Sequence, residues 1–133
     1  MKFILDTNVY IDAALSDVGW KRFEKHIIPL LPFIYLSSVV FFELGLSASE
    51  KKSELLLKSH IETLEKVGRL VTPTFDDWIT SSQMVGNKEL RSYLCDVLIG
   101  CSVRRIGAVL FTFDKKDFAP LSKQLGFEIK QPW

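Results

Sequence analysis

The sequence contains few cysteines and histidines, no excess of charge of either sign and no long hydrophobic run. Two of its 133 residues are cysteine and two are histidine, and 17 Lys and Arg against 16 Asp and Glu leave a formal charge of +1. This balance excludes a global field that would attract a polyanion or an acidic membrane, so nucleic-acid binding must come from a local patch. Cys95 and Cys101 lie on different turns of a segment typical of a helix. We therefore expect two reduced thiols of an intracellular protein rather than a disulfide.

Signals for export and for membrane insertion are also missing. The amino terminus reaches a carboxylate at Asp6 before an apolar signal-peptide stretch could form, and no run approaches the roughly 20 apolar residues of a membrane span. We expect a cytoplasmic protein with no membrane partner. Its composition of 47% hydrophobic and 25% charged residues is that of an ordinary globular protein, and its length predicts a single domain over 1–133.

The chain alternates strand-like and helix-like segments without a repeat, which predicts an α/β fold with helices on both faces of a parallel sheet. Residues 2–6 are typical of a buried central strand, and Asp6-Thr7-Asn8 ends that strand with residue types that cap helices. Further strands are predicted at 33–36, 69–72, 109–113 and 127–130. Helices are predicted from about Asp6, over 17–28, from Ser37 and Ser38 through Ala48, over 54–67, over 78–85 after a capping box of Thr74 and Asp77, and from about 92 to 107.

The acidic residues carry the functional signal. Asp6 and Asp114 each close an apolar strand, where parallel α/β sheets place their ligand crevice. Glu43 and Asp96 each interrupt an apolar helical run, and we expect the face around Glu43 not to be freely solvated. Taken singly, Asp6 could be a helix cap, Asp96 a residue on a solvated helix face and Asp114 the start of a turn. Glu43 is explained by neither a cap nor a turn.

If the four carboxylates converge, they need cations. Burial and like-charge repulsion would raise their pKa values and cost several kcal/mol unless a positive charge neutralises them. His26 and His60 lie in amphipathic stretches without a partner at metal-ligand spacing, so the donors are all oxygen. Oxygen donors suit Mg²⁺ or Mn²⁺ rather than zinc, and such ions are the usual partners of phosphate oxygens. The chemistry implied is metal-assisted cleavage of a phosphoester.

Four stretches, in order and over nearly the whole chain, resemble the PIN-domain ribonucleases, most closely the VapC-type toxins of toxin-antitoxin pairs. They are FILDTNV at 3–9, EL at 43–44, DVLI at 96–99 and LFTFDKKDF at 110–118. The resemblance implies a three-layer α/β/α fold with a central parallel sheet of four to five strands. It also implies a Mg²⁺- or Mn²⁺-dependent endoribonuclease that leaves a 5′-phosphate and a 3′-hydroxyl.

By this resemblance, each matching residue receives a role. The acidic quartet that is catalytic and binds the metal would be Asp6, Glu43, Asp96 and Asp114. Supporting residues that orient carboxylates, metal waters or a phosphate would be Thr7, Asn8 and Thr112, with Asp117 at a less regular acidic position. Lys115 and Lys116 are candidates for contact with the RNA backbone, although a solvated loop explains them equally well.

Partners follow from the same resemblance and from surplus apolar residues. Tyr10, Ile11, Val39, Phe41 and Phe42 exceed what one small core needs, and could form a homodimer seam or a groove for an antitoxin helix. We therefore expect an RNA substrate, a cognate antitoxin protein and a homodimer.

Other functional classes fit less well. A haloacid-dehalogenase-type phosphatase needs a second aspartate at the position of Asn8, and a phosphorelay receiver domain has no place for a Glu43 helix. The alternative that stays open is a catalytically inactive PIN-like interaction module. Divalent-metal dependence of RNA cleavage separates it from a nuclease.

Overall fold

The structure, a computed structural model, describes residues 1–45, 51–85 and 91–133, and within these residues it contains one parallel sheet of five strands. The strands are β1 (Phe3–Leu5), β2 (Ile34–Ser37), β3 (Leu70–Val71), β4 (Val109–Phe111) and β5 (Glu128–Lys130). Their order across the sheet is β3-β2-β1-β4-β5, and every neighbouring pair is parallel. The predicted α/β class, the parallel sheet and the central position of the first strand are confirmed.

Helices connect the strands. They are α1 (Thr7–Leu15), α2 (Asp17–His26), the 3₁₀ helix η1 (Ile28–Phe33), α3 (Ser38–Leu44), α4 (Lys52–Lys66), α5 (Phe75–Val85), α6 (Arg91–Ile106) and α7 (Lys115–Leu125). Side-chain caps fix several of their starts: Ser16 caps α2, Ser37 caps α3, and Thr74 and Asp77 bond reciprocally at the start of α5.

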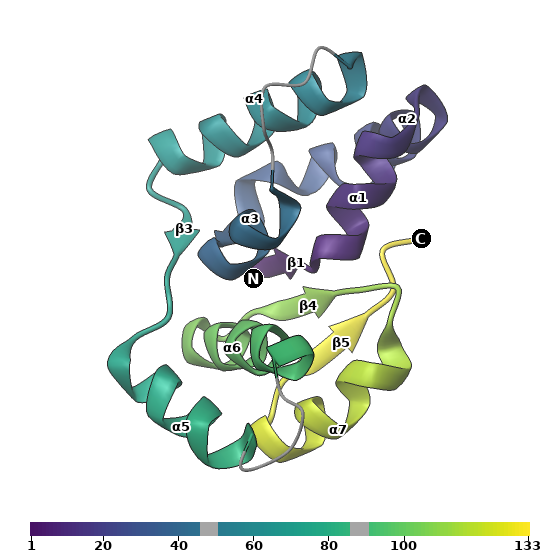
Figure 1. Cartoon of the computed structure of the whole chain (residues 1–133). Helices are drawn as coiled ribbons and strands as arrows, with labels where there is room; N and C mark the ends of the chain where they lie inside the picture. Colours follow the sequence, from purple (N-terminus) through teal and green to yellow (C-terminus); the bar gives the residue numbers. More distant parts are fainter. Residues whose placement is uncertain (46–50, 86–90) are drawn as a thin grey trace.

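The helices form two groups on opposite faces of the sheet. From β1 the chain moves outward to β2 and β3, then returns to β4 and β5 on the other side of β1. Because crossovers between parallel strands are right-handed, α1–α4 lie on one face of the sheet and α5–α7 on the other. In agreement, α1 packs against α2, α3 and α4, whereas α6 packs against α5 and α7 (Figure 1). The strand order reverses between β1 and β4, and a ligand crevice is expected at their carboxyl ends.

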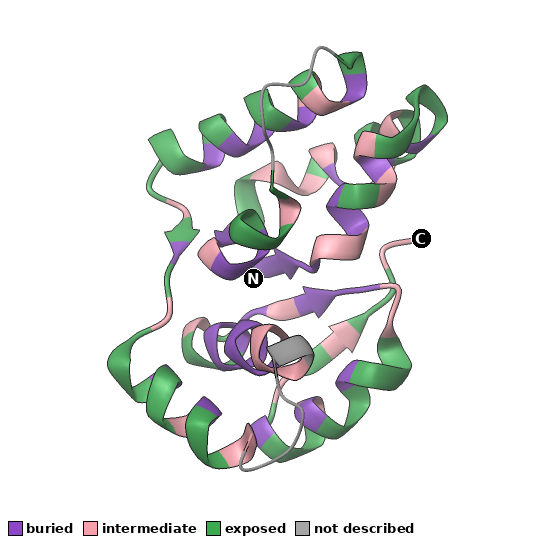
Figure 2. Ribbon diagram, viewed as in Figure 1, coloured by how far each residue is buried: buried purple, intermediate pink, exposed green. Residues whose placement is uncertain are grey.

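The core is built on the two central strands. All three residues of β1 are buried, and in Figure 2 buried residues continue through β4 and the middle of α6. The rings of Phe3 and Phe111 stack with their centroids 4.8 Å apart, which fixes the side-by-side placement of β1 and β4. The amide of Asp6 donates to the carbonyl of Phe111 at 2.8 Å and extends this pairing to the point where both strands end.

Three details of the helices differ from the sequence-based prediction. The helix that was expected to run through Ala48 ends at Leu44, because Gly45 takes the left-handed conformation with φ of 53° and ends the helix as its C-cap; positions 46–48 lie outside the described residues. Helix α5 begins at Phe75, three residues before the predicted start at 78. Helix α7, which contains Pro120, was not predicted.

The described helices are too short or too polar for a membrane span. Among the described residues, none of the helices is long and apolar enough to cross a bilayer.

Candidate active site

Asp6 lies at the reversal of strand order and is buried, with 6% of its surface exposed. It follows β1 directly and caps α1, its Oδ1 accepting the amide of Thr7 at 2.8 Å. Its second oxygen, Oδ2, accepts the hydroxyl of Thr112 at 2.8 Å. The cap that a purely structural interpretation would give Asp6 is therefore present, but it uses only one of the two carboxylate oxygens.

The hydroxyl of Thr112 joins the ends of β1 and β4. It donates to Asp6, accepts the backbone amide of Asp114 at 2.9 Å, and lies 3.3 Å from the side-chain nitrogen of Asn8. Asn8 in turn accepts the amide of Phe113 through Oδ1 at 3.4 Å. The residues that the sequence motifs nominated as supports therefore form one hydrogen-bonded group that sets the orientation of Asp6 and of the chain leading into Asp114.

Glu43 reaches this group from α3. The hydroxyl of Thr7 donates to Glu43 Oε1 at 2.7 Å, so Thr7 touches both Asp6 and Glu43. The expectation that Glu43 lies on a poorly solvated face is wrong: Glu43 is exposed, and so are its neighbours Phe41 and Phe42, at 48% and 80%. The hydrogen bond from Thr7, rather than apolar burial, holds this carboxylate beside the others.

Asp96 faces the same carboxylates from α6. Burial raises its pKa from 3.8 to about 7, with further upward contributions from the charges of Asp6, Glu43 and Asp114, and a last one from Asp117. Burial also raises the pKa of Asp6, a shift that its bonds to Thr112 and Thr7 oppose and that the charges of Glu43 and Asp114 reinforce. The four acids thus lie within electrostatic reach of one another.

Asp114 and Asp117 share the start of α7. Asp114 caps the helix, and the amide of Asp117 lies 3.4 Å from its Oδ1. The hydrogen bond and charge of Asp114 raise the pKa of the exposed Asp117 carboxyl, while Lys116 lowers it. Lys116 lines a cavity together with Asp96, whereas Lys115 is not among the residues that line it. Of the two lysines, the structure places Lys116 beside the acids.

The donor chemistry of this cluster fits a hard divalent cation. Its ligand atoms are carboxylate oxygens, and no basic side chain contributes to the pKa shifts of Asp6 or Asp96 among the described residues. As the side chains stand, no group of three or more His, Cys, Asp or Glu residues in 1–45, 51–85 and 91–133 has the geometry to hold a metal ion. The carboxylates would therefore contact an ion only after their side chains rotate, or through bridging water molecules.

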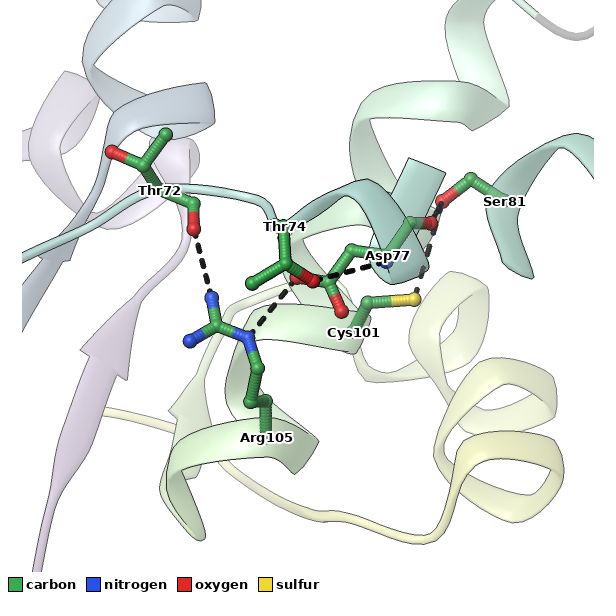
Figure 3. A network of polar contacts seen from close by, with 6 residues as sticks. All are labelled: Thr72, Thr74, Asp77, Ser81, Cys101 and Arg105. Atoms are coloured by element: carbon green, nitrogen blue, oxygen red, sulfur yellow. Dashed lines mark hydrogen bonds and ion pairs between the residues drawn. The ribbon is translucent and has the colours of Figure 1, made fainter. Parts of the chain in front are cut away.

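A second buried acid, Asp77, lies at the start of α5 in a different setting (Figure 3). Its carboxylate accepts the amide of Thr74 at 3.0 Å and lies 3.2 Å from Nε of Arg105, which also donates to the carbonyl of Thr72 at 2.8 Å. Ser81 donates to the carbonyl of Asp77 at 2.7 Å and lies 4.0 Å from Sγ of Cys101. The Asp77 carboxylate thus has both a backbone amide and a guanidinium group as partners.

The apolar residues nominated for partner contact divide into two sets. Tyr10 and Val39 are buried and belong to the core, so that part of the expectation is wrong. Ile11, Phe41 and Phe42 are exposed. Phe42 also lines an apolar groove of about 350 Å³ together with Trp78, which is 48% exposed. Cys95 and Cys101 are free thiols, as the sequence analysis expected.

One residue beside the acids was missed by the sequence analysis. Tyr93 lines the cavity shared by Asp96 and Lys116, and nothing in its sequence neighbourhood distinguishes it from a core aromatic. Only the packing of α6 against α7 identifies it.

The comparisons with known proteins agree with this geometry. The family model for the PIN domain matches residues 3–123. Among solved structures, FitAcB from Neisseria gonorrhoeae is similar over 98% of this chain and 98% of its own, with 22% identity and a TM-score of 0.68. VapBC2 from Rickettsia felis, bound to a DNA fragment from their promoter, covers 100% and 99% at 21% identity and a TM-score of 0.60.

A third solved structure gives the same result. DNA-bound VapBC from Salmonella typhimurium covers 100% of this chain and 99% of its own, at 18% identity and a TM-score of 0.60. At these identities the likeness concerns the fold. No curated protein sequence matches the chain.

Proposed function

The chain belongs to the PIN-domain family, and from that membership and the acidic cluster we propose that it is a Mg²⁺- or Mn²⁺-dependent endoribonuclease, the toxin of a VapBC-type pair. The observation that carries the proposal is the group of Asp6, Glu43, Asp96 and Asp114, whose charges act on one another, while no basic side chain in the described part of the chain lowers the pKa of Asp6 or Asp96. Structural acids are normally paired or solvated, so a partly buried acidic cluster calls for a ligand of opposite charge.

In this proposal each residue has a distinct task. A divalent ion held by the four acids would supply an activated water and neutralise charge on the leaving oxygen of the phosphodiester. Asp6 is fixed by two hydrogen bonds before any ion arrives, and Glu43 is held by Thr7. Asp96, whose pKa burial and the neighbouring acids raise to about 7, would have to lose its proton to act as a ligand of the ion. Thr112 and Asn8 act as positioning residues, because they hold Asp6 and the Asp114 amide in register.

The proposed partners follow from the family and from the surface. The solved relatives carry the names FitAcB and VapBC, and we propose a cognate antitoxin for this chain as well. Exposed apolar residues at Ile11, Phe41 and Phe42 offer contact area to an antitoxin or to a second copy of the chain. The homodimer and the cytoplasmic location stay predictions of the sequence.

The test is cleavage of RNA by the purified full chain. We expect cleavage with Mg²⁺ or Mn²⁺, none after chelation, and loss of cleavage in Asp6→Asn. Asp76→Asn is the matched control, because Asp76 is an exposed acid at the start of α5 outside the cluster. Sequencing of the RNA ends identifies the substrate and should show 5′-phosphates. Partner binding without any metal-dependent cleavage would instead indicate the inactive interaction module.

A further inference from the structure

A cavity of about 460 Å³ opens between α6 and α7 beside the acidic cluster. Tyr93 and Asp96 line it from α6, and Lys116, Asp117 and Pro120 line it from α7. Its volume lies within the range of about 300–1,000 Å³ that small-molecule sites occupy. Because Asp96 belongs both to the cavity and to the cluster, a group bound in the cavity lies next to the proposed point of cleavage.

Helical spacing gathers these residues on two facing surfaces. Tyr93 and Asp96 lie three residues apart and share one face of α6, while Lys116 and Pro120 lie four apart and share one face of α7. The two helices pack against each other. The cavity therefore has an aromatic ring on one wall and a proline ring on the other, which suits a flat, partly apolar group.

The charges of the cavity favour a neutral base over a phosphate in its interior. Asp96 and Asp117 both carry carboxylates, which repel a phosphate from the interior. Among the lining residues that the structure describes, Lys116 is the cation, and it is exposed. Pro120 has no amide hydrogen, so the carbonyl of Lys116 one turn earlier lacks its usual helical donor.

We infer that this cavity binds one unpaired nucleobase of the substrate, stacked on Tyr93, with Lys116 contacting the adjoining phosphate. The inference rests on the proposed function and deepens it by assigning the residues that hold one base of the substrate. A base inside a duplex is stacked between its neighbours and cannot enter a pocket without being extruded. Tyr93 is thus a binding residue beside the reaction, distinct from the acids that would carry it out.

The test compares two pairs of variants by binding and by cleavage. Binding of a short fluorescent single-stranded RNA is followed by anisotropy in the Asp6→Asn background, and KM and kcat are measured with Mn²⁺ in the otherwise native chain. Tyr93→Leu should raise Kd and KM roughly tenfold with little change in kcat, because stacking is lost, while Tyr93→Phe restores both. Lys116→Ala should lower the dependence of log Kd on log salt by about 0.7, the value for one phosphate of a single strand.

Lys123→Ala is the control for the lysine, since Lys123 is exposed on the same helix and lies outside the cavity. The same RNA annealed to its complement should bind equally to Tyr93→Leu and Tyr93→Phe. Tyr93 also packs against the core, so thermal unfolding of each variant verifies that the chain is folded at the assay temperature.

The outcomes separate this inference from the proposed function. If the native chain cleaves RNA but Tyr93→Leu equals Tyr93→Phe and Lys116→Ala equals Lys123→Ala, the cavity is not a base site and the nuclease proposal stands. If the native chain cleaves nothing but single-stranded RNA binding still depends on Tyr93 and Lys116, the nuclease proposal fails and the cavity keeps its assignment.

Discussion

Asp6 and Asp77 are almost equally buried, at 6% and 7% exposure, yet the chain surrounds them differently. Asp77 lies 3.2 Å from Nε of Arg105 and accepts the Thr74 amide, so its charge is balanced within the fold. Asp6 is bonded to Thr7 and Thr112 but is surrounded by the charges of Glu43 and Asp114. Asp77 stabilises the junction of α5 and α6. Asp6 is held in place, but no basic side chain among residues 1–45, 51–85 and 93–133 contributes to its pKa shift, which is the arrangement expected of a site that receives a cation.

Neutralising one acid of each kind, Asp96 in the cluster and Asp77 in the balanced network, should have the largest effect. Asp96→Asn should reduce RNA cleavage by more than about 100-fold, since even outer-shell partners of metal ligands are worth about 10- to 100-fold. Asp77→Asn should leave the cleavage rate unchanged and lower the melting temperature. The measurement is cleavage of a defined RNA with Mn²⁺ beside thermal unfolding of both variants. An Asp96→Asn protein that cleaves RNA at the native rate would refute the assigned role.

The next largest effect is expected at the hydroxyl that links the two central strands. Thr112→Val keeps the shape of the side chain but removes the donor to Asp6 and the acceptor for the Asp114 amide. Cleavage should fall by about 10- to 100-fold, because the carboxylate loses its fixed orientation. Thr112→Ser keeps the hydroxyl and should retain most of the activity. Equal losses in the two variants would show that packing, not the hydrogen bonds, matters at this position.

A third prediction concerns stability in the balanced network. Arg105→Met leaves Asp77 buried without its cation and the carbonyl of Thr72 without this donor. The free energy of unfolding should fall by about 1–3 kcal/mol, the cost of leaving such groups unpaired. Arg104→Met is the matched control on the same turn of α6, and surface substitutions of this kind change stability by about 0.5 kcal/mol or less. Denaturant unfolding measures both, and cleavage should be native-like in both.

The smallest effect is expected in how the stability of the folded chain depends on pH, through the acidic cluster. Without metal, burial and the neighbouring acids raise the pKa of Asp96 from 3.8 to about 7. The folded state then holds this proton more tightly than the unfolded chain, so stability should fall as pH rises from about 4 to about 7, and this contribution should level off above that range. Asp96→Asn lacks the titrating group and should show a flatter curve. Melting temperatures across this range, measured in a chelator, make the comparison, and parallel curves for the two proteins would contradict it.

Much of the fold follows from local signals in the sequence. Caps at Ser37 and at Thr74 with Asp77 are visible as residue types, and the apolar runs between them predict a parallel sheet. Helix α7 was missed because Pro120 argues against a helix wherever it is not in the first turn, and only packing against α6 and β5 overrides it.

Some features of the candidate site could likewise be predicted from the sequence, and others could not. Asp6 and Asp114 could be predicted because they end strands, and the sheet topology then brings them together. The surroundings of Glu43 could not, because Phe41 and Phe42 turn toward solvent instead of into a core. Tyr93 carries no signal at all in the sequence, since its position beside Asp96 depends on where α7 packs.

The pairing of β1 with β4 also decides when the site can exist. Phe3, Ile4 and Leu5 align with Val109, Leu110 and Phe111, so β1 completes its pairing only with a strand that is translated long after it. A growing chain on the ribosome already carries Asp6 and Glu43 but still lacks Thr112 and Asp114. The acids of the cluster therefore come together only after β4 has been translated, however early Asp6 is made.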